Sequence, residues 1–110
     1  MKNIYKKGDI ILIRFPFTNV TDFKVRPALV IRDQNDEDLT VLPISTTVNM
    51  KRQDIAIKKS HYATSPLSIP SVVRLRKITT LHGALVVKKI SEVNREFLGE
   101  VLSALFRYLG

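Results

Sequence analysis

The pattern of hydrophobic residues is the feature that most constrains the fold of this chain. Apolar, β-branched runs of strand length occur at residues 8–15, 28–32, 39–44, 54–58 and 71–80, separated by polar, Gly- or Pro-containing segments. A helical period appears only near the end, between residues 93 and 109. About five strands followed by one helix, without βαβ alternation, predict a mainly β fold: a small antiparallel barrel capped by a C-terminal helix.

The segments around the expected strands carry further expectations. Residues 8–15 are apolar at successive positions, which predicts a strand buried on both faces and ended by Pro16, with residues 17–25 as a loop. The acidic residues 33–38 predict a hairpin tip, and Pro43 in the returning strand indicates an edge or a bulge. Residues 71–80 are expected to form one long strand with an apolar and a basic face.

The last segment predicts an amphipathic helix whose apolar stripe packs against the sheet. Ser91 is the expected N-cap, Glu92 and Glu96 suit the positive end of the helix dipole, and Gly110 suits a C-terminal cap. The stripe consists of Val93, Phe97, Leu98, Val101, Leu102, Leu105, Phe106 and Leu109.

Length and composition exclude several classes of protein. A chain of 110 residues predicts a single domain over residues 1–110, and 45% hydrophobic with 25% charged residues excludes a disordered chain. The absence of cysteine excludes disulfides and thiolate sites. No segment is typical of a signal peptide or reaches the ~20 apolar residues of a membrane helix, so we expect a cytoplasmic protein without membrane contact.

The charge balance favours a polyanionic partner. Eighteen Lys and Arg against ten Asp and Glu give a formal charge of +8. Nucleic acid is the leading partner class, and an acidic protein partner is compatible with it. A basic surface that serves solubility alone remains an equal alternative at this point.

Four short motifs, taken in order, resemble the MazF/PemK (also called Kid) family of toxins. They are Gly8-Asp9-Ile10, Arg26-Pro27-Ala28-Leu29-Val30-Ile31, Val41-Leu42-Pro43-Ile44-Ser45-Thr46 and the segment 72–81. The resemblance implies an SH3-like barrel of the CcdB/MazF/PemK type that forms a homodimer. It further implies a toxin of a type II toxin–antitoxin system, an endoribonuclease that cleaves single-stranded RNA and inhibits translation. Its partner would be a cognate acidic antitoxin, with which such toxins also bind DNA.

The same resemblance implies where RNA is cleaved. Arg26 matches the arginine of the family's cleavage site, and Ser45 matches its strand-end hydroxyl, with Thr46 as the alternative. Arg26 would stabilise charge on the phosphate, because a pKa above ~12 suits a guanidinium poorly to proton transfer. Ser45 or Thr46 would hydrogen-bond a phosphate oxygen or orient the attacking hydroxyl. The alternatives are an Arg26 ion pair with Asp22 or Asp33, and hydroxyls that only bond to local backbone.

Further RNA contacts are expected from stacking aromatic side chains and from basic or hydroxyl groups along the backbone. A solvated charged face and phenylalanines that cover the core are the equal alternative. The candidates are Phe17, Phe23, Lys24, Thr47, Lys51, Arg52, Arg74, Arg76 and Lys77.

Two departures from the family pattern affect the expected chemistry. Arg76-Lys77 stands where family members often have an acidic residue, which puts a carboxylate base from that segment in doubt. The loop after the first strand lacks the family's glycines, so its RNA sequence preference is expected to differ. His61 and His82 have the pKa range of a proton shuttle, but neither lies in a motif and both are expected to be bystanders.

The expected reaction needs no metal or cofactor. In RNA the 2′-hydroxyl can attack the adjacent phosphate, and we expect no His-x-x-x-His motif or carboxylate cluster that holds a catalytic metal. Two other classes remain open: a CcdB-like toxin that poisons gyrase without cutting, and a non-catalytic RNA-binding barrel of SH3 or OB type.

Overall fold

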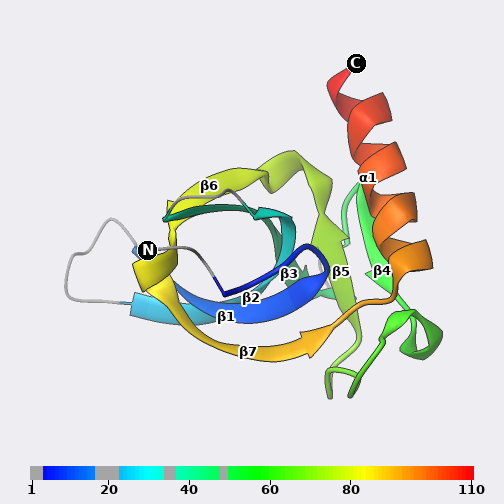
Figure 1. The fold of residues 1–110 in the computed structure, drawn as a ribbon. Coiled ribbons are helices and arrows are strands. Elements are labelled where there is room, and N and C mark those ends of the chain that lie inside the picture. Colours follow the sequence, from blue (N-terminus) through cyan, green and yellow to red (C-terminus); the bar gives the residue numbers. More distant parts are fainter. Residues whose placement is uncertain (1–3, 17–22, 34–36, 48–49) are drawn as a thin grey trace.

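The computed structural model describes residues 4–16, 23–33, 37–47 and 50–110. Within these residues the fold is mainly β with one C-terminal helix, as the hydrophobic pattern predicts (Figure 1), but the sheet has seven strands where about five were expected. The order along the sheet is β4-β5-β3-β2-β1-β7, and β6 pairs with β3; all pairs are antiparallel. The elements are β1 (Asp9–Pro16), β2 (Phe23–Asp33), β3 (Asp38–Thr46), β4 (Asp54–Ile57), β5 (Ser71–Arg74), β6 (Thr79–His82), β7 (Val86–Glu92) and α1 (Arg95–Leu109).

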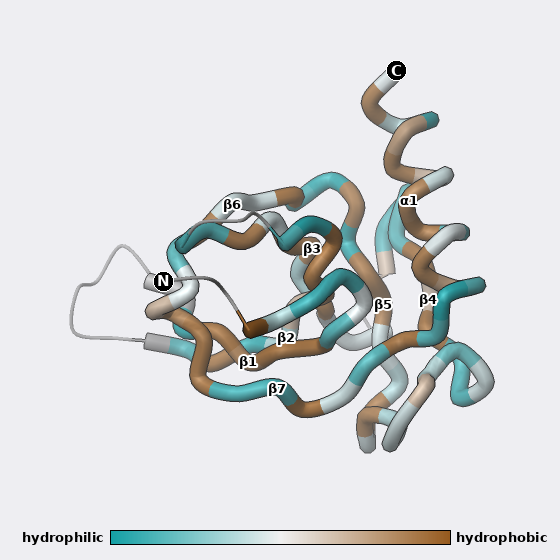
Figure 2. Tube along the Cα trace, in the orientation of Figure 1, coloured by the Kyte–Doolittle hydropathy of each residue, from teal (hydrophilic) through white to brown (hydrophobic). Residues whose placement is uncertain are grey.

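The central strands are buried on both faces and contribute side chains to two hydrophobic cores. In β1, Ile10 faces one core while Ile11 and Ile13 face the other, which confirms the expected two-sided burial. In Figure 2 the hydrophobic colour runs along much of β1 and recurs along α1. The helix-side core comprises Ile10, Leu29, Ile31, Leu42, Ile44, Ile57, Val73, Leu75, Val93, Phe97, Val101 and Leu105. The second core comprises Ile11, Ile13, Ala28, Val30, Leu39, Val41 and Leu81.

The turn that leads into β1 depends on Gly8. Its φ of 94° lies in the left-handed region, which glycine adopts without strain. The Gly8 N–H donates to the Val30 carbonyl at 2.8 Å, and its carbonyl accepts from the Val93 N–H at 2.8 Å. The buried Asp9 carboxylate then meets Lys89 Nζ of β7 at 3.1 Å. The Gly-Asp pair therefore joins the start of β1 to β2 and to the end of β7.

The expected long strand over residues 71–80 is wrong. It is broken into β5 and β6 by a 3-10 turn, Leu75–Lys77. Both strands pair with the same edge of β3, β5 with Ile44–Thr46 and β6 with Asp38–Val41, so the chain must step from one partner region to the next. The predicted basic face is divided as a result, with Arg76 and Lys77 exposed on the turn.

Pro43 does not mark an edge strand, because β3 is central. Pro43 lies opposite Ala28 of β2, at a position where neither β5 nor β6 pairs with β3 on the other side. A proline is tolerated there because no strand on that side needs its missing N–H. The irregularity in the β2–β3 pairing lies instead between Val30 and Arg32.

Two element boundaries also differ from expectation. Residues 23–25 belong to β2 and not to a loop, because they pair with residues 14–16 of β1; residues 17–22 lie outside the described part. Strand β7 was not predicted. Its buried Ser91 pairs with Ile10, so Ser91 and Glu92 are strand residues and Ser91 is not the N-cap.

The helix begins after Asn94, whose side chain accepts a hydrogen bond from the Phe97 N–H at 2.8 Å. Glu96 lies in the first turn as expected, and the Gly110 N–H caps the other end by donating to the Phe106 carbonyl. Phe97, Val101 and Leu105 are buried against the sheet, whereas Phe106 and Leu109 are exposed. The predicted stripe thus packs over most of its length and not at its end. No described helix is long and apolar enough to span a membrane.

Candidate functional site

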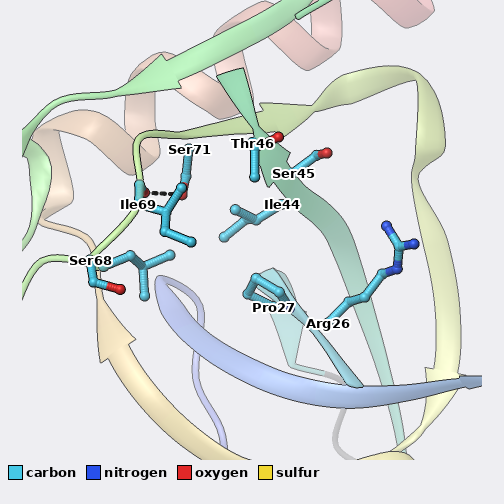
Figure 3. A pocket seen from close by; sticks show the side chains of 9 residues that line it. Arg26, Pro27, Ile44, Ser45, Thr46, Ser68, Ile69 and Ser71 are labelled. Carbon is cyan, nitrogen blue, oxygen red and sulfur yellow. Dashed lines mark hydrogen bonds between the residues drawn. The ribbon is translucent and has the colours of Figure 1, made fainter. Parts of the chain in front are cut away.

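A pocket of about 300 Å³ opens where β2 and β3 meet the segment that precedes β5 (Figure 3). The predicted catalytic residues Arg26, Ser45 and Thr46 all line it. The complete lining is Arg26, Pro27, Ile44, Ser45, Thr46, Leu67, Ser68, Ile69 and Ser71.

The strand register explains why Arg26 and Ser45 come together. The β2–β3 pairing ends at Ala28 and Pro43, and Arg26 and Ser45 each lie two residues beyond this last pair. Because side chains alternate along a strand, Arg26 shares a face with Ala28, and Ser45 shares a face with Pro43. Figure 3 shows the Arg26 side chain and the Ser45 hydroxyl on the same side of the pocket. The site therefore combines an exposed guanidinium with a hydroxyl beside an apolar floor of Pro27 and Ile44.

The facing wall of the pocket was not predicted. It consists of Leu67, Ser68, Ile69 and the buried Ser71. The Ser71 hydroxyl donates to the Ile69 carbonyl at 2.7 Å, and the Thr47 N–H donates to the Pro70 carbonyl at 3.2 Å, which fixes this segment beside β3. Residues 61–70 have no period, so no sequence signal places them at the site.

A buried ion pair stands behind Ser45. Nη2 of Arg74 donates to Ser45 Oγ at 3.2 Å, and Nη1 donates to Asp54 Oδ2 at 3.0 Å. The Asp54 side chain is 1% exposed and also accepts from the Lys51 N–H at 2.8 Å. Arg74, predicted as an RNA contact, is thus held by a carboxylate that the sequence analysis missed. Asp54 and Arg74 are opposite residues of β4 and β5, a pairing visible only in the tertiary register.

Among the residues whose side chains the structure describes, the remaining predicted RNA contacts do not line the pocket. Basic side chains are exposed on three separate elements: β2, the turn before β4, and the 3-10 turn after β5. Thr47 is exposed just beyond β3, and Phe23 lies at the start of β2, while Phe17 falls outside the described residues. The exposed basic residues are Lys24, Lys51, Arg52, Arg76 and Lys77.

The alternative ion pairs expected for Arg26 have different outcomes. Asp33 lies at the opposite end of β2, where its carboxylate accepts from the Lys7 N–H at 3.3 Å. Asp22 lies outside the described residues. Arg26 therefore does not form the expected ion pair with Asp33.

Neither histidine lines the pocket, and both make local contacts elsewhere. His61 Nδ1 accepts from the Lys58 N–H at 2.9 Å. His82 Nδ1 accepts from the Ala84 N–H at 3.0 Å, which leaves Nε2 to donate to Glu37 at 2.9 Å. This hydrogen bond lowers the pKa of Glu37 below its ordinary value.

The described residues form no metal site, and they form a second pocket that could bind a ligand. Among the described residues, no three His, Asp or Glu side chains lie close enough together to hold a metal ion. A second pocket, of about 480 Å³, lies between β4 and α1 and is lined by Ile55, Gly99, Glu100, Ser103, Ala104 and Arg107.

Comparison with known proteins identifies a family and several structures of similar fold. The family model described as "PemK-like, MazF-like toxin of type II toxin-antitoxin system" matches residues 6–109. A MazE-MazF crystal structure from Deinococcus radiodurans is 17% identical with a TM-score of 0.78, over 98% of each chain. An endoribonuclease in complex with its cognate antitoxin, from a mycobacterial species, is 17% identical with a TM-score of 0.73 (98% and 95% covered). Mycobacterium tuberculosis toxin MazF-mt6 is 21% identical with a TM-score of 0.65 (90% and 96% covered). No curated protein matches the sequence.

Proposed function

Because the chain belongs to the family of PemK-like, MazF-like toxins of type II toxin–antitoxin systems, we propose that it is an endoribonuclease that cleaves single-stranded RNA. The observation that carries this proposal is the pocket shared by Arg26 and Ser45. A guanidinium and a hydroxyl at the same pocket can both donate hydrogen bonds to a scissile phosphate and stabilise the charge that develops on it. The likeness to structures named as endoribonucleases supports the same function.

The proposed reaction uses the substrate's own nucleophile and no metal. The 2′-oxygen attacks the adjacent phosphorus, the bond from phosphorus to the 5′-oxygen breaks, and the products are a 2′,3′-cyclic phosphate and a free 5′-hydroxyl. One proton leaves the 2′-oxygen and one arrives at the 5′-oxygen, so no water is consumed. Arg26 would donate two N–H groups to the phosphate as its negative charge increases, and Ser45 or Thr46 would donate to a phosphate oxygen.

The same proposal covers the partners and organisation of the protein. An acidic antitoxin is the expected inhibitor, because it complements a chain of net charge +8 and because a protein of similar fold has been solved in complex with its cognate antitoxin. A homodimer acting in the cytoplasm, one domain per chain, and DNA binding together with the antitoxin complete the proposal.

RNA cleavage in the presence of EDTA tests the activity. Purified protein incubated with a long single-stranded RNA should produce fragments with 2′,3′-cyclic phosphate and 5′-hydroxyl ends. Several RNAs of different sequence should be used, because the sequence preference is expected to differ from that of the family. Intact RNA in all of them would contradict the proposal and would leave a gyrase-poisoning or purely RNA-binding protein.

Replacement of Arg26 separates an enzyme from an RNA-binding protein. Arg26→Ala should lower the cleavage rate by about 10²-fold or more, the usual loss on removing a preorganised donor. Its affinity for RNA should fall only by about one phosphate contact, seen as a decrease of roughly one in the salt slope. Arg32→Ala is the matched control, because Arg32 is exposed on the same strand and does not line the pocket.

A further inference from the structure

A chain of polar contacts leads from a buried carboxylate to the edge of the pocket. Asp54 holds Arg74 at 3.0 Å, and Arg74 donates to the Ser45 hydroxyl at 3.2 Å. The three residues lie on β4, β5 and β3, which are neighbours in the sheet. We refer to Asp54, Arg74 and Ser45 as the relay.

We propose that Asp54 is a positioning residue for RNA cleavage: it fixes Arg74 so that Ser45 presents its hydroxyl hydrogen to the phosphate. This inference rests on the proposed endoribonuclease function and deepens it. It also selects Ser45 over Thr46 as the hydroxyl donor, because the relay ends on Ser45.

Donor and acceptor chemistry gives the relay its direction. A serine hydroxyl has one hydrogen to donate, whereas a guanidinium has only donors and no acceptor. Because Arg74 donates to Ser45 Oγ, the Ser45 hydrogen cannot return to Arg74 and must find another acceptor. Since Ser45 lines the pocket, a phosphate oxygen bound beside it would supply that acceptor. The positive charge of Arg74 also polarises the O–H bond and strengthens it as a donor.

The surroundings of Asp54 show how firmly it is held. Its side chain is 1% exposed, that of Arg74 is 16% exposed, and the Lys51 N–H supplies a second donor at 2.8 Å. The Asp54 N–H returns a bond to the Lys51 carbonyl at 3.0 Å, which closes a tight turn. Gln53 in that turn has a φ of 77°, a left-handed value that favours glycine. The chain thus accepts local backbone strain immediately before the residue that anchors the relay.

A buried ion pair is weak evidence for a purely structural role. Desolvation of both charges offsets much of their attraction, so an apolar pair of similar size would stabilise the fold equally well. Directional control of a third group is what the charged pair adds here. The planar fork of Arg74 can hold Asp54 with one nitrogen and Ser45 with another, which a lysine at that position cannot do.

A double-mutant cycle tests the proposal by measuring kcat and KM for RNA cleavage. Asp54→Asn should lower kcat by about 10- to 100-fold and change KM little. The upper bound is the usual cost of losing a preorganised donor, about 10²-fold. In a Ser45→Ala background the same Asp54→Asn change should lower kcat no further, since the group that it positions is gone. An unchanged kcat, or an equal loss in both backgrounds, would overturn the proposal.

Two further variants separate positioning from folding. Asp9→Asn is the matched control, because Asp9 is also a buried carboxylate paired with a cation but lies away from the pocket; it should lower stability and leave kcat unchanged. Arg74→Lys keeps a cation for Asp54 but lacks the second nitrogen for Ser45, so it should fold and still lose kcat. If Asp54→Asn does not fold, full kcat in Arg74→Lys overturns the proposal instead. A wild-type protein that cleaves no RNA would refute the proposed function and the relay together, whereas wild-type cleavage with active relay variants would refute the relay alone.

Discussion

The imidazole ring of His61 stacks on the phenyl ring of Phe97, with centroids 4.2 Å apart and an angle of 17° between the planes. Phe97 is buried in the helix-side core, and the His61 carbonyl accepts from the Asn94 N–H at the start of α1. The stack therefore fastens the 3-10 turn Lys59–His61 to the first turn of the helix. Because His61 does not line the pocket, we expect it to be a structural residue.

Replacement of His61 should affect stability and not catalysis. His61→Ala should lower the free energy of unfolding by about 1–3 kcal/mol, because it removes an aromatic stack and a hydrogen bond from the Lys58 N–H. His61→Phe, which keeps the stack, should lose less. Urea unfolding and RNA cleavage rates measure the two properties, and a cleavage defect in both folded variants would show that His61 takes part in the reaction.

The pKa of Glu37 should depend on His82. In the wild type the hydrogen bond from His82 lowers this pKa, and in His82→Ala it should move back toward the ordinary value. Because the folded pKa is depressed, the stabilisation is present above the unfolded pKa and is lost as pH falls through the folded one. NMR titration of the side-chain carboxyl carbon measures the shift, and an identical pKa in both proteins would contradict the assignment.

Alkaline pH should weaken the ion pair between Lys89 and Asp9. The hydrogen bond to Asp9 raises the pKa of Lys89 above its ordinary value. Since the folded pKa is raised, the stabilisation is complete below the unfolded pKa of about 10.4 and is lost as pH rises through the folded value. The stability difference between wild type and Lys89→Met should therefore narrow above that range in urea unfolding.

A second alkaline effect makes the variant comparison necessary. Burial raises the pKa of Tyr62, so its ionisation also destabilises the fold as pH rises. Both proteins in the comparison share this loss, so their difference reports Lys89. A difference that stays constant across the alkaline range would show that the ion pair makes no contribution.

Two glycines should respond in opposite directions to alanine. Gly8→Ala forces a side chain onto a φ of 94° and should cost about 1–3 kcal/mol of stability. Gly99→Ala, in a helix with nothing within 4 Å of the added Cβ, should stabilise by up to about 1 kcal/mol. Thermal unfolding of both variants checks the pair, and a loss at Gly99 comparable to that at Gly8 would contradict this reading of the turn.

Strand positions in this chain could be predicted where burial alone determines them. The apolar runs of β1 to β4 and the helical stripe follow from periodicity, and the acidic segment 33–38 predicts the pairing of β2 with β3 as a hairpin. The break between β5 and β6 could not be predicted, because it depends on which part of β3 each strand meets. Strand β7 was missed for a related reason: its Lys88 and Lys89 are exposed, and only pairing with β1 makes the segment a strand.

The candidate site shows the same division. Arg26 and Ser45 could be proposed together because the resemblance supplied both motifs, and the β2–β3 register brings them to one pocket. Asp54 and the wall from Leu67 to Ser71 could not, since neither has a motif and each reaches the site through tertiary pairing.

The alternation of side chains along the three central strands ties the two hydrophobic cores to each other. Leu39 and Val41 belong to one core while Leu42 and Ile44, on the same strand, belong to the other. Because the same strand backbone carries side chains of both cores, unfolding of one core also removes side chains from the other. The protein should therefore unfold as one cooperative unit, and the floor of the pocket, formed by Pro27 and Ile44, should not open separately from the rest of the sheet.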